Sequence, residues 1–197
     1  QAAVKGVLPE QLTDLGTQII LSNTYHLALR PGSELIEAAG GLHQFMHWDR
    51  PILTDSGGYQ VFSLQSQRTI DAEGVVFKSH LDGSKHRFTP QTVVDHQVRL
   101  GSDIMMPLDI CTPYGASRRQ TEADMRVTHR WEAEAVAYWQ SLETDQLLFG
   151  LVQGGMFDDL RKVSVAAITQ HPFSGFAIGG VSVGEPMADM HRIIETV

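Results

Sequence analysis

The 197-residue chain contains a single cysteine, Cys111. One cysteine excludes a disulfide within the chain, and it also excludes a structural zinc site built on several cysteines. We therefore expect a protein of a reducing compartment, the cytoplasm, with no metal ion or cofactor held by this chain.

Long apolar runs are also absent, and no segment approaches the 18 residues that a membrane helix requires. The N-terminus has no signal-peptide pattern, so we expect no membrane association. The chain opens at Gln1 without a methionine and stops at Val197 inside a predicted helix. We expect both ends to be internal to a longer protein.

Positive charge is scarce: 15 Lys and Arg face 23 Asp and Glu, for a net charge of -8. Nucleic-acid-binding proteins usually carry a basic patch. This sequence offers only short clusters such as Arg118-Arg119. Charge alone therefore argues against a nucleic-acid partner.

Several catalytic signatures are missing as well. There is no GxGxxG fingerprint, P-loop or HExxH motif, and no serine sits in a nucleophile elbow. The nine histidines are scattered, and the pair His43 and His47 has no third ligand nearby. We expect these histidines in the core or on the surface. Cys111 has no base partner in sequence and is interpreted as a pocket wall.

Short apolar segments alternate with helical patterns along the chain. The five segments predicted as buried parallel strands, apolar on both faces, are 18–22, 51–54, 103–108, 147–152 and 175–179. Alternation of this kind predicts an α/β fold with a parallel sheet. A doubly wound sheet and a (β/α)8 barrel both fit, although a full barrel needs about 250 residues.

Helix signals lie between the predicted strands. Thr89 caps a helix that begins at Pro90 and ends at Gly101, and Ser117 caps a longer one. The remaining helices are predicted to begin near Asp158 and Pro186. We expect two of these helices to bury an apolar stripe. Its residues are Val127, Trp131, Ala135 and Tyr138 on the first helix, and Leu160, Val163, Val165, Ala166 and Ile168 on the second. Residues 75–78 and 85–88 flank Asp82-Gly83, which predicts an inserted β-hairpin.

Polar or glycine-rich residues follow all five predicted strands. Ligands of both candidate folds bind at the carboxyl ends of the strands, so these residues should share one rim. The segments are Ser22-Asn23-Thr24-Tyr25-His26, Asp55-Ser56-Gly57-Gly58-Tyr59-Gln60, Asp109-Ile110-Cys111-Thr112-Pro113, Gln153-Gly154-Gly155 and Gly179-Gly180-Val181-Ser182-Val183-Gly184-Glu185. Each of them alone also fits an ordinary capped turn or packing loop.

Together these groups suit a planar heterocycle. Carboxylates complement the amino and N1–H groups of guanine, and an amide or backbone N–H complements its O6. A glycine pair lets the ligand approach the backbone, and Tyr59 can stack on the ring.

The motifs resemble those of the tRNA-guanine transglycosylase (queuine tRNA-ribosyltransferase) family, bacterial type. The resemblance covers nearly the whole chain. It is carried by Asn23-Thr24-Tyr25-His26-Leu27, Arg30-Pro31-Gly32, the run from Thr54 to Leu64, Asp109-Ile110-Cys111-Thr112-Pro113, Gly150-Leu151-Val152-Gln153-Gly154-Gly155 and the run from Gly175 to Glu185. It implies an irregular (β/α)8 barrel, of which residues 1–197 would form an incomplete part within a single domain.

The resemblance also implies an activity. Such enzymes replace the wobble guanine in the anticodon loop of certain tRNAs by a 7-deazaguanine, preQ1 in bacteria, through a covalent Asp–ribose intermediate. Asp55 matches the residue that handles the proton, and Asp109 matches the carboxylate that recognises the base. The substrate-binding residues implied are Asp55, Ser56, Gly57, Gly58, Tyr59, Gln60, Asp109, Cys111, Gln153, Gly154, Gly179 and Gly180.

Two departures qualify this resemblance. Ile110 stands where bacterial members mostly carry Glu, whereas Cys111 and Val183 match the preQ1 type. The nucleophilic Asp, the zinc ligands and most of the basic tRNA-binding surface of the family have no counterpart in this chain, which reconciles its acidity with a tRNA substrate. We expect zinc and a homodimer only in a longer protein, and no exchange by this chain alone. The alternatives are a non-catalytic partner subunit and another barrel enzyme acting on a free purine.

Overall fold

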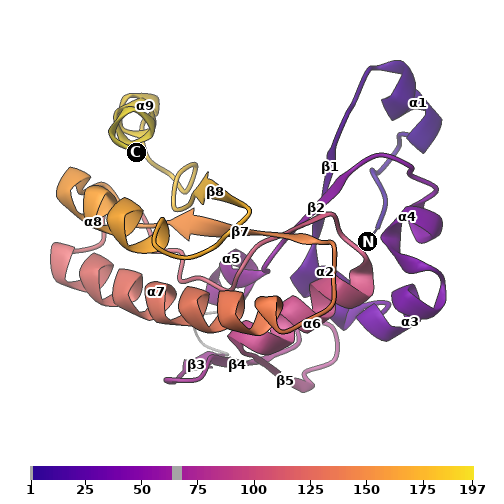
Figure 1. Cartoon of the computed structure of the whole chain (residues 1–197), viewed down its shortest axis with the longest axis horizontal. Helices are drawn as coiled ribbons and strands as arrows, with labels where there is room; N and C mark the ends of the chain where they lie inside the picture. Colours follow the sequence, from indigo (N-terminus) through magenta and orange to yellow (C-terminus); the bar gives the residue numbers. More distant parts are fainter. Residues whose placement is uncertain (1, 64–67) are drawn as a thin grey trace.

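A curved parallel sheet forms the frame of the molecule in the computed structural model, which describes residues 2–63 and 68–197 (Figure 1). Gln1 and Leu64, which closes one of the motifs above, lie outside the described residues. The strands are β1 Ile20–Asn23, β2 Ile52–Asp55, β6 Ile104–Met105, β7 Leu147–Val152 and β8 Gly175–Ile178. Their order β1-β2-β6-β7-β8 follows the sequence, so every connection steps to the neighbouring strand.

All five strands lie where the sequence predicts them, and all pairs are parallel. The prediction is too long for β6, which pairs over only two residues on each side. The sheet is open within the described residues, since β1 and β8 form its two edges.

A second, antiparallel sheet joins β3 Arg68–Ile70, β4 Val75–Lys78 and β5 Lys85–Phe88. The two strands predicted around Asp82-Gly83 pair with each other, with Val75 opposite Phe88. The third strand, β3, was not predicted from the sequence. It adds to the far edge of β4, with Ile70 opposite Val75.

Helices cover the outer side of the large sheet (Figure 1). They are α1 Pro9–Asp14, α2 Thr24–Leu29, α3 Ser33–Ala38, α4 Gly41–Met46, α5 Gly58–Ser63, α6 Pro90–Leu100, α7 Arg118–Gln140, α8 Asp158–Ile168 and α9 Met187–Thr196. Neighbours in the row α3, α6, α7, α8 and α9 contact one another. The caps of α6 agree with the prediction: Thr89 accepts from the Thr92 N–H, and Gly101 ends the helix with left-handed backbone.

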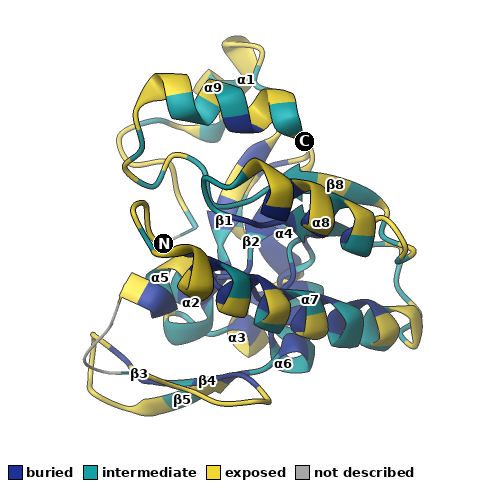
Figure 2. Ribbon diagram, turned by 90° about the vertical axis from the view of Figure 1, so that its left-hand side faces the viewer, coloured by how far each residue is buried: buried dark blue, intermediate teal, exposed yellow. Residues whose placement is uncertain are grey.

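The core lies between these helices and the sheets, and the outer faces of α7 and α8 are exposed (Figure 2). One cluster joins the small sheet to α5, α6 and α7 through Phe62, Phe77, Phe88 and Trp131. A second cluster, around Trp48, lies beneath β1 and β2, and a third lies between α6, α7, β6 and β7. The small sheet is therefore anchored to the main body by aromatic side chains.

Two burial predictions are wrong. The strands are not buried on both faces, because Leu21 of β1 is 65% exposed and Phe176 of β8 is 47% exposed. Burial alternates along β1 and also along the central strand β7, so one face of the sheet is less covered than the other. On α8, Val163 and Ala166 are exposed, while Arg161 and Ser164 occupy the buried face.

No helix in the described part of the chain combines the length and apolarity needed to cross a membrane.

Candidate active site

Two hydrogen-bonded carboxylates, Asp55 and Asp109, lie at the carboxyl ends of the parallel strands. Asp55, the last residue of β2, lies opposite Asn23 of β1 in the register. The Asn23 Nδ2 donates to Asp55 Oδ2 at 2.7 Å, and the backbone N–H groups of Thr24 and Gly57 donate to Oδ1 at 3.3 and 3.1 Å. Burial nevertheless raises the pKa of Asp55 to about 6, against the opposing effect of these three donors.

Asp109 is a second carboxylate at the same edge and is only 8% exposed. The Gln153 Nε2 donates to its Oδ2 at 2.6 Å, and the Ser56 hydroxyl lies 3.4 Å from its Oδ1. Burial raises the pKa of Asp109 to about 6, and the charge of Asp55 adds to that rise. Two carboxyl groups at this edge thus have pKa values raised toward neutral pH, a property typical of functional sites.

The loops after β7 and β8 complete this edge. The side chain of Gln153 reaches Asp109 on one side and lies against Gly179 and Gly180 on the other. A Cβ atom at Gly180 would lie 2.6 Å from Gln153 Oε1, and the φ of Gly180 is +62°. Only glycine fits this position without moving the glutamine. The Gln153 Oε1 itself is buried and accepts no hydrogen bond from the described residues.

Side chains from the helices replace backbone pairing around the short strand β6. Gln97 of α6 accepts from the Met106 N–H at 2.9 Å and donates to the Met106 carbonyl at 2.9 Å. Thr128 of α7 accepts from the Ile110 N–H at 3.0 Å, and Glu132 of α7 accepts from the Leu151 N–H. The backbone N–H and carbonyl groups after β6 are therefore hydrogen-bonded although they pair with no strand. This path of the chain places Asp109 in the site.

A cavity of about 370 Å³ lies against Ile110 and Cys111, which follow Asp109 in the chain, but neither Asp55 nor Asp109 is part of its lining. Tyr59, Cys111 and Val183 contribute to its wall, together with Phe62, Ser63, Arg68, Ile70, Ile110, Pro113, Gln120 and Asp124. Tyr59 is 58% exposed, so its ring is available to a ligand. Burial, with the charge of Asp109, raises the pKa of the Cys111 thiol to about 12, which makes Cys111 a neutral wall residue and a poor nucleophile.

Known proteins with similar sequences identify the family of this chain. A family model described as Queuine tRNA-ribosyltransferase matches residues 1–197. The chain belongs to this family. A queuine tRNA-ribosyltransferase of Dictyoglomus turgidum is 52% identical over 196 residues, 99% of this chain and 50% of that protein. Those of Desulforudis audaxviator and Nitratidesulfovibrio vulgaris are 54% and 55% identical, over 100% and 98% of this chain and 53% and 51% of those proteins. The chain thus spans about half the length of these relatives.

Three of the residues predicted for the site also have packing roles. Gly57 packs against Tyr25 of α2, and Gly154 lies against the backbone of α8 at Arg161. The amide oxygen of Gln60, on α5, is buried without a partner in the described residues. The two glycines thus let the loops after β2 and β7 pack closely against helices.

Sequence reasoning missed several residues that build the site. Asn23 is part of a sequence motif but not of the predicted site, yet its side-chain amide donates a hydrogen bond to Asp55. Arg161 was not singled out, although it is fully buried on α8 beside Gln153 and Gly180. Its position one residue after Leu160 and one helical turn before Ser164 was the available signal, because that spacing puts an arginine on the buried stripe.

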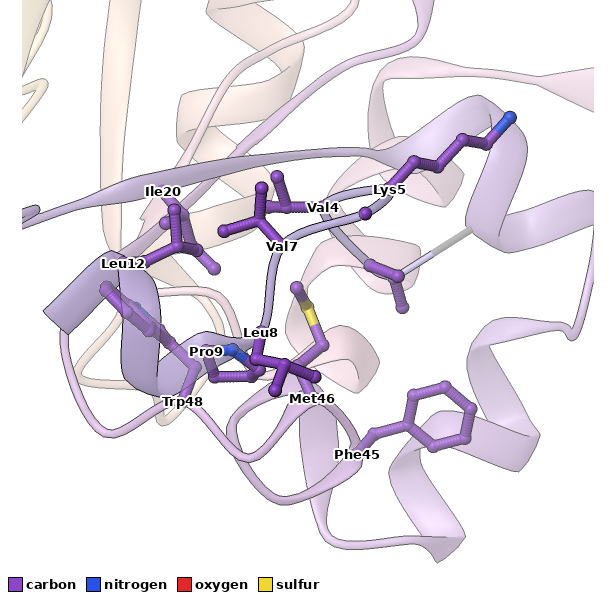
Figure 3. A pocket seen from close by; sticks show the side chains of 13 residues that line it. Val4, Lys5, Val7, Leu8, Pro9, Leu12, Ile20, Phe45, Met46 and Trp48 are labelled. Carbon is purple, nitrogen blue, oxygen red and sulfur yellow. The ribbon is translucent and has the colours of Figure 1, made fainter. Parts of the chain in front are cut away.

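A larger cavity of about 550 Å³ lies away from this site, between the N-terminal segment and α4 (Figure 3). Apolar side chains such as Val7, Leu12, Ile20 and Trp48 line it, and the Lys5 ammonium group points away from it. The cavity offers no carboxylate or amide side chain for recognising a polar base. In the described residues no group of three His, Cys, Asp or Glu side chains is placed to hold a metal ion.

Proposed function

We propose that this chain forms the base-binding half of an enzyme that exchanges the wobble guanine of specific tRNAs for a 7-deazaguanine, in queuosine biosynthesis. One observation carries the proposal: at the carboxyl ends of the parallel strands the Gln153 amide donates to the buried Asp109, and the charge of Asp55 acts on Asp109. Membership of the queuine tRNA-ribosyltransferase family supports the reaction class.

Asp109 and Gln153 are the residues proposed to recognise the base. An ionised Asp109 can accept from the amino group and N1–H of guanine at once. The Gln153 amide, which donates to Asp109 in this structure, can turn its donor to O6, and Gly180 packs against the same amide. Tyr59 would stack on the ring, and Ser56, Gly57, Gly58, Gln60, Cys111, Gly154 and Gly179 complete the proposed site.

Asp55 is proposed as the proton acceptor and donor. A pKa of about 6 lets it lose and regain a proton near neutral pH. In the proposed mechanism another Asp attacks the ribose C1′, the bond to guanine breaks with its electron pair, and the incoming base later displaces that Asp. We place that nucleophile in the half of the relatives that this chain does not span.

The same reasoning extends to the whole protein. We propose that the open sheet is part of a (β/α)8 barrel, and that structural zinc is bound outside this chain. The partners would be a tRNA anticodon loop in the cytoplasm and a second copy of the protein. Cys111 and Val183 on the cavity wall favour preQ1 as the incoming base.

Calorimetric titration of the whole protein with guanine tests the base site. Asp109→Asn should weaken guanine binding by about 10- to 100-fold, because one charged acceptor is lost. Asp103→Asn is the matched control, since Asp103 accepts from the Ile52 N–H and His43 at the other end of β6. Binding should also weaken below about pH 6, where Asp109 is protonated. Equal affinities for the two variants would refute the proposed site.

A further inference from the structure

Arg161 is a fully buried cation whose hydrogen bonds all go to backbone carbonyls. Its Nε donates to the Gly155 carbonyl at 2.8 Å, and its Nη1 donates to those of Val152 and Gly179 at 2.8 and 2.7 Å. Its Nη2 lies 3.3 Å from the Gly180 carbonyl. The guanidinium forms no direct ion pair with a carboxylate of the described residues, and the charge of Glu185 acts on it only at longer range.

These four carbonyls belong to the last residue of β7 and to the loops that follow β7 and β8. The loop after β7 carries Gln153, and the loop after β8 carries Gly180. A single rigid guanidinium fork therefore sets the distance between the two groups proposed to contact O6 of the base. Arginine suits this role because its donors lie in one plane with fixed angles.

The hydrogen bond from Arg161 to the Gly179 carbonyl also affects the N–H of Gly180. That carbonyl and the Gly180 N–H belong to the same peptide group, and a cation bound to the oxygen polarises the N–H at the opposite end. The Gly180 N–H donates to no atom of the described residues, so it remains available to a ligand.

We propose that Arg161 is a positioning residue that orients and polarises the Gly180 N–H as the donor for the carbonyl oxygen of the base. The inference rests on the proposed function, because it needs a base in the site. A fully buried charge without a carboxylate partner is costly. The four carbonyl acceptors offset this cost. The buried guanidinium polarises the Gly180 N–H, which gives the site a strong donor near O6 without a cation in contact with the base.

The test compares guanine with 6-thioguanine, which keeps N1–H and the amino group but carries sulfur, a weak acceptor, in place of O6. The proteins are the whole wild-type protein, Arg161→Lys, Arg161→Gln and the control Arg118→Gln, whose native arginine pairs with Asp159 at the surface. In the wild type and the control, guanine should bind more tightly than 6-thioguanine.

Arg161→Gln should bind guanine about tenfold more weakly while binding 6-thioguanine almost as before, so its preference for oxygen disappears. Arg161→Lys keeps a charge but not the fork, and it should restore only part of the preference. A general loosening of the loops would instead weaken both bases equally, and that result would overturn the inference. If the wild type binds neither base, the proposed function itself fails.

A crystal structure of the wild type with guanine gives a second test that does not depend on the variants folding. The inference requires the Gly180 N–H within hydrogen-bond distance of O6 while Arg161 still donates to the Gly179 carbonyl. A bound base whose O6 contacts only Gln153 would contradict it.

Discussion

Asp109, the residue proposed to recognise the base, makes the folded state less stable when its buried carboxyl group is ionised. Its pKa of about 6 lies above the usual value of 3.8, so the folded state holds the proton more tightly than the unfolded chain does. This group therefore favours folding most below about pH 4, and its contribution falls as the pH rises through 6. The buried charge then costs about 3 kcal/mol at pH 8.

Asp109→Asn should consequently raise the free energy of unfolding by about 1–3 kcal/mol at pH 8, and by much less at pH 4.5. Urea denaturation at the two pH values measures the difference. Asp145→Asn, at an exposed turn before β7, is the control for the lost charge and should change little at either pH. A gain that is equal at both pH values would show that the carboxylate is not the cause.

Gly57 is the residue that packs the turn after β2 against α2. Its φ is +76°, and an added Cβ would lie 2.6 Å from Tyr25 Cβ and 2.8 Å from Tyr25 N. Gly83 has nearly the same φ, +75°, but no atom lies within 4 Å of its Cβ position. The two glycines thus share the backbone requirement and differ in the clash.

Gly83→Ala should cost about 1 kcal/mol for the left-handed backbone alone. Gly57→Ala should cost about 1–3 kcal/mol more, because the backbone of α2 must move. It should also weaken guanine binding, because the Gly57 and Thr24 N–H groups that donate to Asp55 would move away from it. Equal thermal shifts for the two variants would disprove the role of close packing.

At the scale of elements, the helices hold the short strand β6 in place. Gln97 satisfies both backbone groups of Met106 and accepts from the Thr54 hydroxyl at 2.9 Å. Gln97→Leu leaves these buried groups unpaired and should lower stability by about 2–4 kcal/mol. Gln91→Leu changes a partly exposed residue on the same helix and serves as the control. Similar denaturation midpoints for the two variants would count against this role.

The long elements could be predicted from the sequence because their signals are local. Apolar runs located all five parallel strands, and Thr89-Pro90 and Gly101 bounded α6. The six-residue helices α1 to α5 lack two full turns of amphipathic pattern, so periodicity did not reveal them. β3 was missed because a three-residue strand is too short to show an alternating pattern, although Asp71 and Gly74 in the loop to β4 are turn-forming residues.

The site could be predicted in part for a related reason. Residues that follow strands share one edge by topology alone, so Asp55, Asp109 and Gln153 were found from position. Arg161 lies inside a helix, where an arginine usually faces solvent, and only the three-dimensional packing shows it behind the loops. Its contacts are with carbonyls, which carry no side-chain signature in a sequence.

At the scale of the whole molecule, the chain carries the proposed base-binding groups but spans about half the length of its relatives. Its charge of -8 also gives it little attraction for tRNA. We expect labelled guanine to enter tRNA when the whole protein is present and not with this chain alone. Exchange by the chain alone would show that the nucleophile lies among its own residues.

The open sheet predicts how this chain behaves by itself. Within the described residues, β1 and β8 are unpaired along their outer edges, and Leu21 and Phe176 expose apolar side chains on these strands. Unprotected strand edges with apolar side chains promote association between chains. We therefore expect the isolated chain to form larger species as its concentration rises, measured by size-exclusion chromatography with light scattering.

Leu21→Lys should reduce this association, because a charge on an edge strand opposes pairing with another chain. Leu81→Lys is the matched control: Leu81 is 43% exposed, but it lies in the turn between β4 and β5, away from either edge of the large sheet. If β1 is a contact edge, only the first variant shifts the mass distribution toward the monomer. A wild-type chain that stays monomeric at every concentration would mean that the edges are protected in solution.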